Sequence, residues 1–239
     1  ALARDAGKLA GKLGLEIVRA SVCIPGPFDY AGGVSLMKHK YQSVFGVPLR
    51  PWFIKTLGNI PVTFLHDSTA FLLGAVKAEE LARHRRICGV IIGTGLGFAS
   101  MYDGQMNLNP QGGPGISIFA RPFGEGTAED YVSRRAIERA YSKKHPQRAV
   151  PSVKDIAGLA MAGDPVAADC FKDMGRRLGQ VLRDIIEKEQ FTLVLLGGAI
   201  SKSSELFIPQ LRDTLPGLNA EIRPAGDIDL APLLGAAKS

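Results

Sequence analysis

The stretch ICGVIIGTGLGFASMYDGQ, residues 87–105, places three glycines at alternate positions between two apolar runs. The apolar run before the glycines predicts a strand. The residues after Gly97 are again mainly apolar and predict a second strand. Asp103-Gly104 then forms the kind of pair that closes a tight turn. The stretch therefore predicts a β-hairpin whose first turn is rich in glycine.

The glycine turn is a candidate phosphate-binding site. Gly93, Gly95 and Gly97 carry no Cβ, so backbone N–H groups there are open to an anion, and Thr94 adds a hydroxyl donor. A strand and not a helix follows, which argues against a dinucleotide-binding fingerprint. The Lys-Ser/Thr of a P-loop is also absent. An ordinary hairpin turn remains the alternative.

Strands and helices alternate along the rest of the chain, which predicts an α/β fold. We expect strands within 16–26, 59–67, 192–200 and 220–225. We expect helices over 68–86, 128–144, 153–163, 164–190, 203–215 and 229–239. Asp164 and Pro165 are a suitable N-cap and first residue for the long helix. The first residues, 1–16, are typical of the tail of an amphipathic helix, and we expect further sequence upstream.

Composition indicates a globular protein. The 239 residues are 46% hydrophobic and 22% charged, with a formal charge of +6. The scattered basic residues favour solvated helix faces, His84 included, over a nucleic-acid-binding stripe. No apolar run is long enough for a membrane helix, and no signal peptide is visible. His39 and His145 are assigned to ordinary loop or helix positions.

Three cysteines, Cys23, Cys88 and Cys170, lie far apart in the sequence without a CxxC pair. A disulfide framework or a cysteine zinc site is therefore not expected, and each cysteine is interpreted as a small core residue. The pattern predicts a cytoplasmic protein.

Two further stretches carry candidate chemistry. Asp67 lies between an apolar strand and an apolar helix, where it can cap the helix or accept a proton from a substrate hydroxyl. Gly197 and Gly198 end a buried strand, where bare backbone offers a flat surface for a purine and ribose. A tight strand–helix turn is the alternative there.

The order of the motifs is more specific than any one of them. PGPFD near the start, HD before a helix, GTGLG in a hairpin, AEDYVS, LLGGAI and LLGAA follow one another between about Gly14 and Ala237. In this order the chain resembles the ROK family of sugar kinases and sugar-responsive repressors. That resemblance implies the two-lobed actin-like ATPase (ribonuclease H-like) fold.

The resemblance also implies roles for individual residues. Asp67 matches the family's general base, and His66 stands where the family has a sugar-binding Asn. Glu129 matches a glutamate that contacts the sugar ring. Gly93, Thr94, Gly95 and Gly97 match the ATP-phosphate hairpin, and Gly197 with Gly198 the adenosine side. Tyr131 and Ser133 are interpreted as structural.

The chain departs from the family pattern in four places. The N-terminal DxGGT phosphate loop is absent, which fits the expected upstream sequence. The sugar-binding ExGH is replaced by NLNPQGGPGISIFARPFGEG, residues 107–126, in which Glu125 is a possible substitute beside the simpler reading of a surface residue. The cysteine-rich zinc motif is missing, so no structural zinc is expected. His66 replaces Asn.

The leading hypothesis is an ATP- and Mg²⁺-dependent kinase acting on a hexose or N-acetylated hexosamine. The alternatives are a sugar-sensing ROK transcriptional regulator and a sugar-binding protein without turnover. We expect a small lobe of residues 1–86 with 227–239, a large lobe of residues 87–226, and a homodimer.

Overall fold

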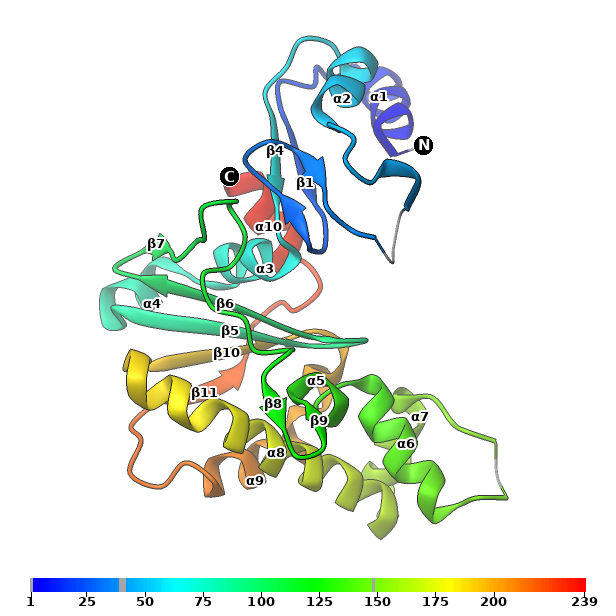
Figure 1. Ribbon diagram of the computed structural model, residues 1–239, viewed down its shortest axis with the longest axis vertical. Coiled ribbons are helices and arrows are strands. Elements are labelled where there is room, and N and C mark those ends of the chain that lie inside the picture. Colours follow the sequence, from blue (N-terminus) through cyan, green and yellow to red (C-terminus); the bar gives the residue numbers. More distant parts are fainter. Residues whose placement is uncertain (1, 39–41, 148) are drawn as a thin grey trace.

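A computed structural model describes residues 2–38, 42–147 and 149–239, arranged as a small region above a large sheet with helices on both faces (Figure 1). His39 lies outside the described residues. In the described part of the chain, no helix is long and apolar enough to cross a membrane.

The small region is built on two parallel strands, β1 (Ala20–Cys23) and β4 (Val62–Leu65). Around them lie α1 (Leu2–Leu13), the hairpin β2 (Phe28–Asp29) and β3 (Val34–Ser35), the 3₁₀ helix η1 (Gln42–Val44) and α2 (Arg50–Leu57). Phe28, Tyr30, Val62 and Phe64 form its core. The strand predicted within 16–26 is present only as the four residues of β1. Cys23 is exposed, so the assignment of Cys23 to the core is wrong.

The large sheet has five strands in the order β11-β10-β5-β6-β7. These are β11 (Glu221–Pro224), β10 (Leu193–Gly197), β5 (Arg86–Ile92), β6 (Leu96–Tyr102) and β7 (Gln105–Met106). β5, β10 and β11 run parallel, and β6 returns antiparallel to β5, so the predicted hairpin is confirmed. Asp103 and Gly104 both have positive φ, as the tight turn requires.

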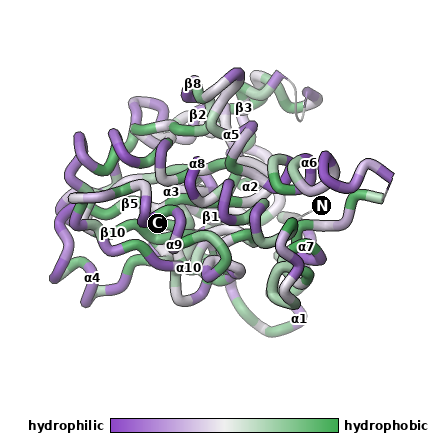
Figure 2. Tube along the Cα trace, turned by 90° about the horizontal axis from the view of Figure 1, so that it is seen from below, coloured by the Kyte–Doolittle hydropathy of each residue, from purple (hydrophilic) through white to green (hydrophobic). Residues whose placement is uncertain are grey.

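The main core lies below this sheet. It is covered by α5 (Ala128–Tyr131), α6 (Arg134–Lys144), α7 (Val153–Met161), α8 (Pro165–Glu189), η2 (Ala199–Leu206) and α9 (Ile208–Asp213), with the short hairpin β8 (Pro122–Phe123) and β9 (Gly126–Thr127) beside α5. Hydrophobic residues follow β5 and β10 through the interior, whereas outer helical turns are hydrophilic (Figure 2). The predicted cap of α8 is confirmed, since the Asp164 carboxylate accepts from Ala167 N at 2.9 Å. The single helix predicted over 128–144 is instead α5 and α6, which separate at Val132 and Ser133.

The upper face of the sheet is covered by α3 (Asp67–Ala75) and α10 (Ala231–Lys238), which lie between the sheet and the small region (Figure 1). The two helices cross at Gly74 and Gly235. A Cβ on Gly74 would lie 1.7 Å from the Ala231 carbonyl oxygen, and one on Gly235 equally close to that of Ala70. Only glycine allows this approach, which fixes the position of α3 and of the residues at its start.

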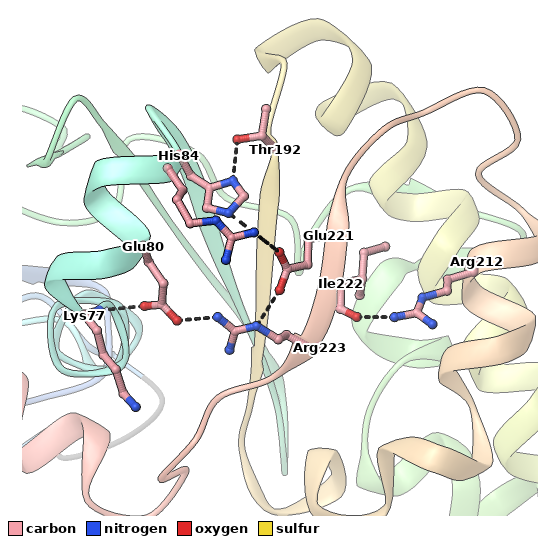
Figure 3. Close-up of polar contacts among 9 residues, drawn as sticks. Lys77, Glu80, His84, Thr192, Arg212, Glu221, Ile222 and Arg223 are labelled. Carbon is pink, nitrogen blue, oxygen red and sulfur yellow. Dashed lines mark hydrogen bonds and ion pairs between the residues drawn. The ribbon is translucent and has the colours of Figure 1, made fainter.

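The helix predicted over 68–86 is broken after Ala75, and a separate helix α4 (Ala78–Arg83) follows. The Glu80 carboxylate accepts from Lys77 N at 2.6 Å and pairs with Arg223 on β11 (Figure 3). His84 is also not solvated as predicted. Its side chain is only 11% exposed and lies between Thr192 and Glu221 (Figure 3).

Candidate functional site

Three strands end immediately before residues that the sequence singled out. β4 is followed by His66 and Asp67, β5 by Gly93, and β10 by Gly198. Ligands of open α/β sheets bind beyond the carboxyl ends of the strands. The candidate residues therefore lie where the fold class places a ligand.

Asp67 is the first residue of α3, and the N-cap is His66, one residue earlier than the cap predicted from the sequence. One oxygen of the Asp67 carboxylate, Oδ1, accepts from Ser68 N at 2.8 Å and lies 2.8 Å from His66 Nδ1. The Asp67 side chain is 60% exposed. Its carboxylate is thus held in place and still open to a ligand.

The charge state of Asp67 suits a base. Partial burial raises the pKa of the Asp67 carboxyl, but the hydrogen bond and charge of His66 and the Ser68 N–H outweigh it, so the pKa lies below its ordinary value. The carboxylate is therefore ionised at neutral pH. Burial, and then the charge of Asp67, raise the pKa of the Tyr30 hydroxyl, which stays protonated beside it.

Ser68 joins this carboxylate to the glycine hairpin. Its Oγ donates to the Phe98 carbonyl oxygen at 2.9 Å, and a Cβ on Gly97 would lie 3.5 Å from Ser68 Cβ. The first turn of α3 therefore packs against β6 directly after the glycine turn. The sequence analysis did not identify Ser68, although its position next to Asp67 at a helix start was a usable signal.

The glycine turn has room for an anion. Gly93 N donates to Gly95 O at 3.0 Å, and Gly93 O accepts from Arg134 N at 2.8 Å. In the described part of the chain the N–H groups of Thr94 and Gly95 have no acceptor, and no heavy atom lies within 4 Å of a Cβ built on Gly93. Two backbone donors and an open approach are what a phosphate group requires.

Glu129 lies against the same turn. Its Oε2 accepts from Leu96 N at 2.9 Å, and its Oε1 accepts from Arg135 at 3.1 Å. A Cβ on Gly95 would lie 2.4 Å from Glu129 Oε2, so glycine is needed there to accommodate the carboxylate. The sugar contact implied for Glu129 stays a prediction, and its carboxylate already supports the backbone of the hairpin.

Gly197 and Gly198 bring the end of β10 against neighbouring elements. A Cβ on Gly197 would lie 2.3 Å from the Phe71 ring of α3, and one on Gly198 2.3 Å from the Ile92 carbonyl oxygen of β5. Gly198 has a φ of 82°, which disfavours other residues. The glycine pair thus lies beside the last residue before the glycine turn, and the candidates from the three strand ends form one region.

The first part of the segment that replaces ExGH, residues 107–115, forms a loop that contacts the small region, and its later part includes β8 and the start of β9. Asn109 Oδ1 accepts from the N–H groups of Gln111 and Gly113, each at 3.0 Å. Gln111 O then accepts from Tyr30 N at 2.8 Å. Glu125 is exposed. Tyr30, which directly follows PGPFD, was not among the predicted site residues.

The donor set suits a metal ion that arrives with a nucleotide. Within residues 2–38, 42–147 and 149–239, no three His, Cys, Asp or Glu side chains form a group that could hold a metal ion. Mg²⁺ in kinases is bound through one or two carboxylates together with substrate phosphates. The open glycine turn fits a phosphate group that would bring such an ion.

Comparisons with known proteins give a family match over part of the chain and relatives over most of it. A family model described as "ROK family" matches residues 123–238. The matched residues make up just under half of the chain and resemble the ROK family. It is 26% identical over 261 residues to a glucokinase of Streptomyces coelicolor, covering 93% of this chain and 78% of that protein.

Solved ROK structures share the fold. A ROK family glucokinase from Streptomyces griseus in complex with glucose and AMPPNP matches with a TM-score of 0.80 at 22% identity, over 98% of this chain and 85% of that one. A ROK family transcriptional regulator, a homolog of the E. coli MLC protein, matches with a TM-score of 0.81 at 22% identity, over 99% and 66%. The chain therefore has the two-lobed actin-like ATPase fold, and the expected boundaries of the lobes stay a prediction.

Proposed function

We propose that the protein is a kinase that transfers the γ-phosphoryl group of ATP to a hydroxyl of a hexose or an N-acetylated hexosamine. The observation that carries the proposal is the attachment of the Asp67 helix start to the glycine hairpin by the 2.9 Å hydrogen bond from Ser68 to Phe98. This bond keeps an ionised, exposed carboxylate beside two free backbone donors. Phosphoryl transfer depends mainly on such positioning.

Asp67 accepts the proton of the attacking hydroxyl. Its lowered pKa keeps it ionised, and its hydrogen bonds from His66 and Ser68 use Oδ1 and leave Oδ2 for the substrate. A positioned base of this kind contributes about 10²- to 10⁴-fold to the rate. The start of α3 also favours the negative charge.

The remaining predicted residues bind the two substrates. His66 and Glu129 border the sugar, with Glu129 acting largely through the Leu96 backbone that it holds. Thr94 and the glycines at 93, 95 and 97 bind the phosphates, and Gly197 with Gly198 borders the adenosine. When bound, ATP supplies the phosphoryl group and Mg²⁺ neutralises its charge. Closure of the two lobes excludes water from the site.

Two wider properties belong to the same proposal. By resemblance to the family we propose a homodimer that works in the cytoplasm. Sugar binding without turnover is the second candidate function, because the Glu129 carboxylate is held by Leu96 and Arg135 and the loop at 107–115 replaces ExGH. A sugar-sensing regulator is its variant, in keeping with the regulator among the structural neighbours.

A coupled ADP-release assay tests the kinase. Glucose, mannose, galactose, N-acetylglucosamine and N-acetylmannosamine are each supplied with MgATP. We expect turnover with at least one of them and a loss of about 10²- to 10⁴-fold in kcat/KM in Asp67→Asn. Turnover that persists undiminished in Asp67→Asn would rule out the base.

Asp103→Asn is the matched control. Asp103 is an exposed aspartate at the opposite end of the sheet, paired with Arg85 at 2.5 Å. We expect its kcat/KM to stay within about 2-fold of the parent, since surface ion pairs contribute little. No turnover of any sugar by the parent protein, together with measurable sugar binding, would favour the second candidate function.

A further inference from the structure

His66 is the residue at which this chain departs from the ROK pattern inside the site, and its hydrogen-bond partners reveal its tautomer. Nδ1 lies 2.7 Å from Ser68 Oγ, 2.8 Å from Asp67 Oδ1 and 3.2 Å from Ser68 N. Each of these partners has few hydrogens that it can donate. Their number decides whether Nδ1 or Nε2 of the neutral ring carries the hydrogen.

The Ser68 hydroxyl has one hydrogen, and it is donated to Phe98 O at 2.9 Å. The Ser68 N–H points to Asp67 Oδ1 at 2.8 Å, closer than Nδ1. Neither Ser68 Oγ nor Asp67 Oδ1 has a hydrogen left to donate to Nδ1. The hydrogen of these contacts must therefore be on Nδ1 itself. With Nδ1 unprotonated, its lone pair would face a carboxylate oxygen at 2.8 Å, which is repulsive.

In the neutral ring Nε2 is then a hydrogen-bond acceptor. No hydrogen bond reaches it from the described residues, and the side chain is 21% exposed. Nε2 borders Gly26, where an added Cβ would lie 3.7 Å from Nε2 and 3.5 Å from Tyr30 Oη. An atom at that point would be in ordinary van der Waals contact with both atoms, so a small group fits between them.

Tyr30 Oη matches Nε2 in polarity. Its hydrogen is donated to Ile24 O at 3.1 Å, and burial, with the charge of Asp67, raises the pKa of the hydroxyl, so it stays a phenol with only lone pairs to offer. Two acceptors therefore border one small space beside the Asp67 carboxylate. We define this acceptor pair as His66 Nε2 and Tyr30 Oη.

We propose that the acceptor pair selects sugars that present a hydroxyl hydrogen at this point, with His66 as the specificity-determining residue. The inference rests on the proposed function for the identity of the ligand, but the tautomer of His66 does not. An Asn at position 66 would present either an N–H₂ donor or a carbonyl acceptor by rotation. His66 presents an acceptor alone, so the chain requires a donor from its substrate.

The tautomer is tested first, without any sugar. The chain has four histidines, so ¹⁵N-detected NMR of labelled protein at pH 8, compared with His66→Asn, identifies the His66 signals. We expect the neutral ring to carry its hydrogen on Nδ1. A hydrogen on Nε2 overturns the inference, whatever the kinase assay gives.

The selection is tested by calorimetric binding of glucose, mannose, galactose and N-acetylglucosamine. The tightest ligand is then compared with its monodeoxy and monodeoxyfluoro analogues, because fluorine replaces the hydroxyl in size but donates no hydrogen. At one ring position we expect both analogues to bind about 10- to 100-fold more weakly than the parent sugar. In His66→Asn the fluoro analogue should recover to within about 3-fold of the parent sugar, since the amide donates. His145→Asn, at the end of α6, is the control and should keep the wild-type pattern.

The outcomes separate the two proposals. Sugar binding with the fluorine effect but no turnover rejects the kinase and supports the acceptor pair. Turnover with binding that is indifferent to fluorine at every position supports the kinase and overturns the acceptor pair. Binding of none of the four sugars overturns the acceptor pair, and the coupled assay with its five sugars decides the kinase separately.

Discussion

The two ends of the parallel strands in the large sheet use polar groups in opposite ways. At the amino ends of β5, β10 and β11, Arg223 lies between Glu80 and Glu221, and His84 between Thr192 and Glu221 (Figure 3). At the carboxyl ends, two described backbone N–H groups of the glycine turn, those of Thr94 and Gly95, have no protein acceptor. Groups that are paired within the protein stabilise it, whereas pre-positioned groups without a partner are available to a ligand.

The means of support also differ. Ion pairs between side chains of α4, β11 and the residues around them hold the amino ends, whereas close approaches at glycine help to hold the carboxyl ends, to the Glu129 carboxylate at Gly95 and to the Ile92 carbonyl oxygen at Gly198. Side chains that fill space would obstruct a ligand, so a site built from bare backbone keeps its shape and stays accessible.

Gly198→Ala should have the largest effect. The new Cβ would lie 2.3 Å from the Ile92 carbonyl oxygen at a φ of 82°, so the backbone must shift. We expect the free energy of unfolding to fall by about 3 kcal/mol, measured by urea denaturation. Gly217→Ala is matched in φ at 79° but meets nothing within 4 Å, and should cost about 1 kcal/mol. Equal losses would show that the approach to Ile92 contributes nothing.

Glu80→Ala tests the amino ends. It removes the acceptor of Lys77 N and one of the two partners of Arg223. Because the Glu80 side chain is only 11% exposed, we expect a loss of about 2 kcal/mol in the free energy of unfolding. kcat/KM should stay within about 2-fold, since no site residue contacts this cluster.

Glu79→Ala, at the exposed neighbouring position, is the control and should change stability by less than about 0.5 kcal/mol. A loss of kcat/KM well beyond about 2-fold in Glu80→Ala would show that the amino ends of the strands also affect the site.

Gly95→Ala should act on activity more than on stability. Its Cβ would displace the Glu129 carboxylate from Leu96 N and Arg135, which loosens the turn that holds the phosphates. We expect kcat/KM to fall about 10-fold with a small change in unfolding. In a Glu129→Ala background the same substitution should add little, because the clash is gone. Additive effects would show that Glu129 and Gly95 act separately.

The sequence predicted those parts of the fold that local pattern determines. The hairpin of β5 and β6 follows from alternating glycines between apolar runs, and the start of α8 follows from Asp164 and Pro165. The break after Ala75 was missed because the apolar spacing continues through it, while Glu80, which fixes the new helix, pairs with Arg223 far along the chain. His84 was misplaced for the same reason, since its partners are Thr192 and Glu221.

The residues of the candidate site could be proposed from the sequence, but the contacts between them could not. Asp67 and the glycines stand out by residue type and position. The hydrogen bond from Ser68 to Phe98 and the contact between Glu129 and Gly95 depend on how distant elements pack. His66 is the N-cap because its backbone is extended, with φ −67° and ψ 144°, and Asp67 already lies in the helix, whereas cap preferences alone would choose the aspartate.

Glu221→Gln should have a small effect on stability with a defined pH dependence. The hydrogen bond from Arg223, and then the charges of Arg223, Arg83 and His84, lower the pKa of the Glu221 carboxyl below its ordinary value. A lowered pKa in the folded protein stabilises it above the ordinary pKa, and this contribution is lost as the pH falls through the folded pKa. The side chain is 37% exposed, so the contribution at pH 7 should be less than about 1 kcal/mol.

Urea denaturation of the parent and of Glu221→Gln between pH 7 and pH 3 measures it. The difference in unfolding free energy should be constant at neutral pH and vanish between about pH 5 and pH 3. A difference that grows as the pH falls would mean that the folded state prefers the protonated carboxyl. Asp67 has a lowered pKa as well, but it is the more exposed of the two carboxylates. Asp67→Asn should therefore change stability less than Glu221→Gln, and it should change kcat/KM far more. This pair of variants compares a residue at the carboxyl ends of the strands with one at the amino ends.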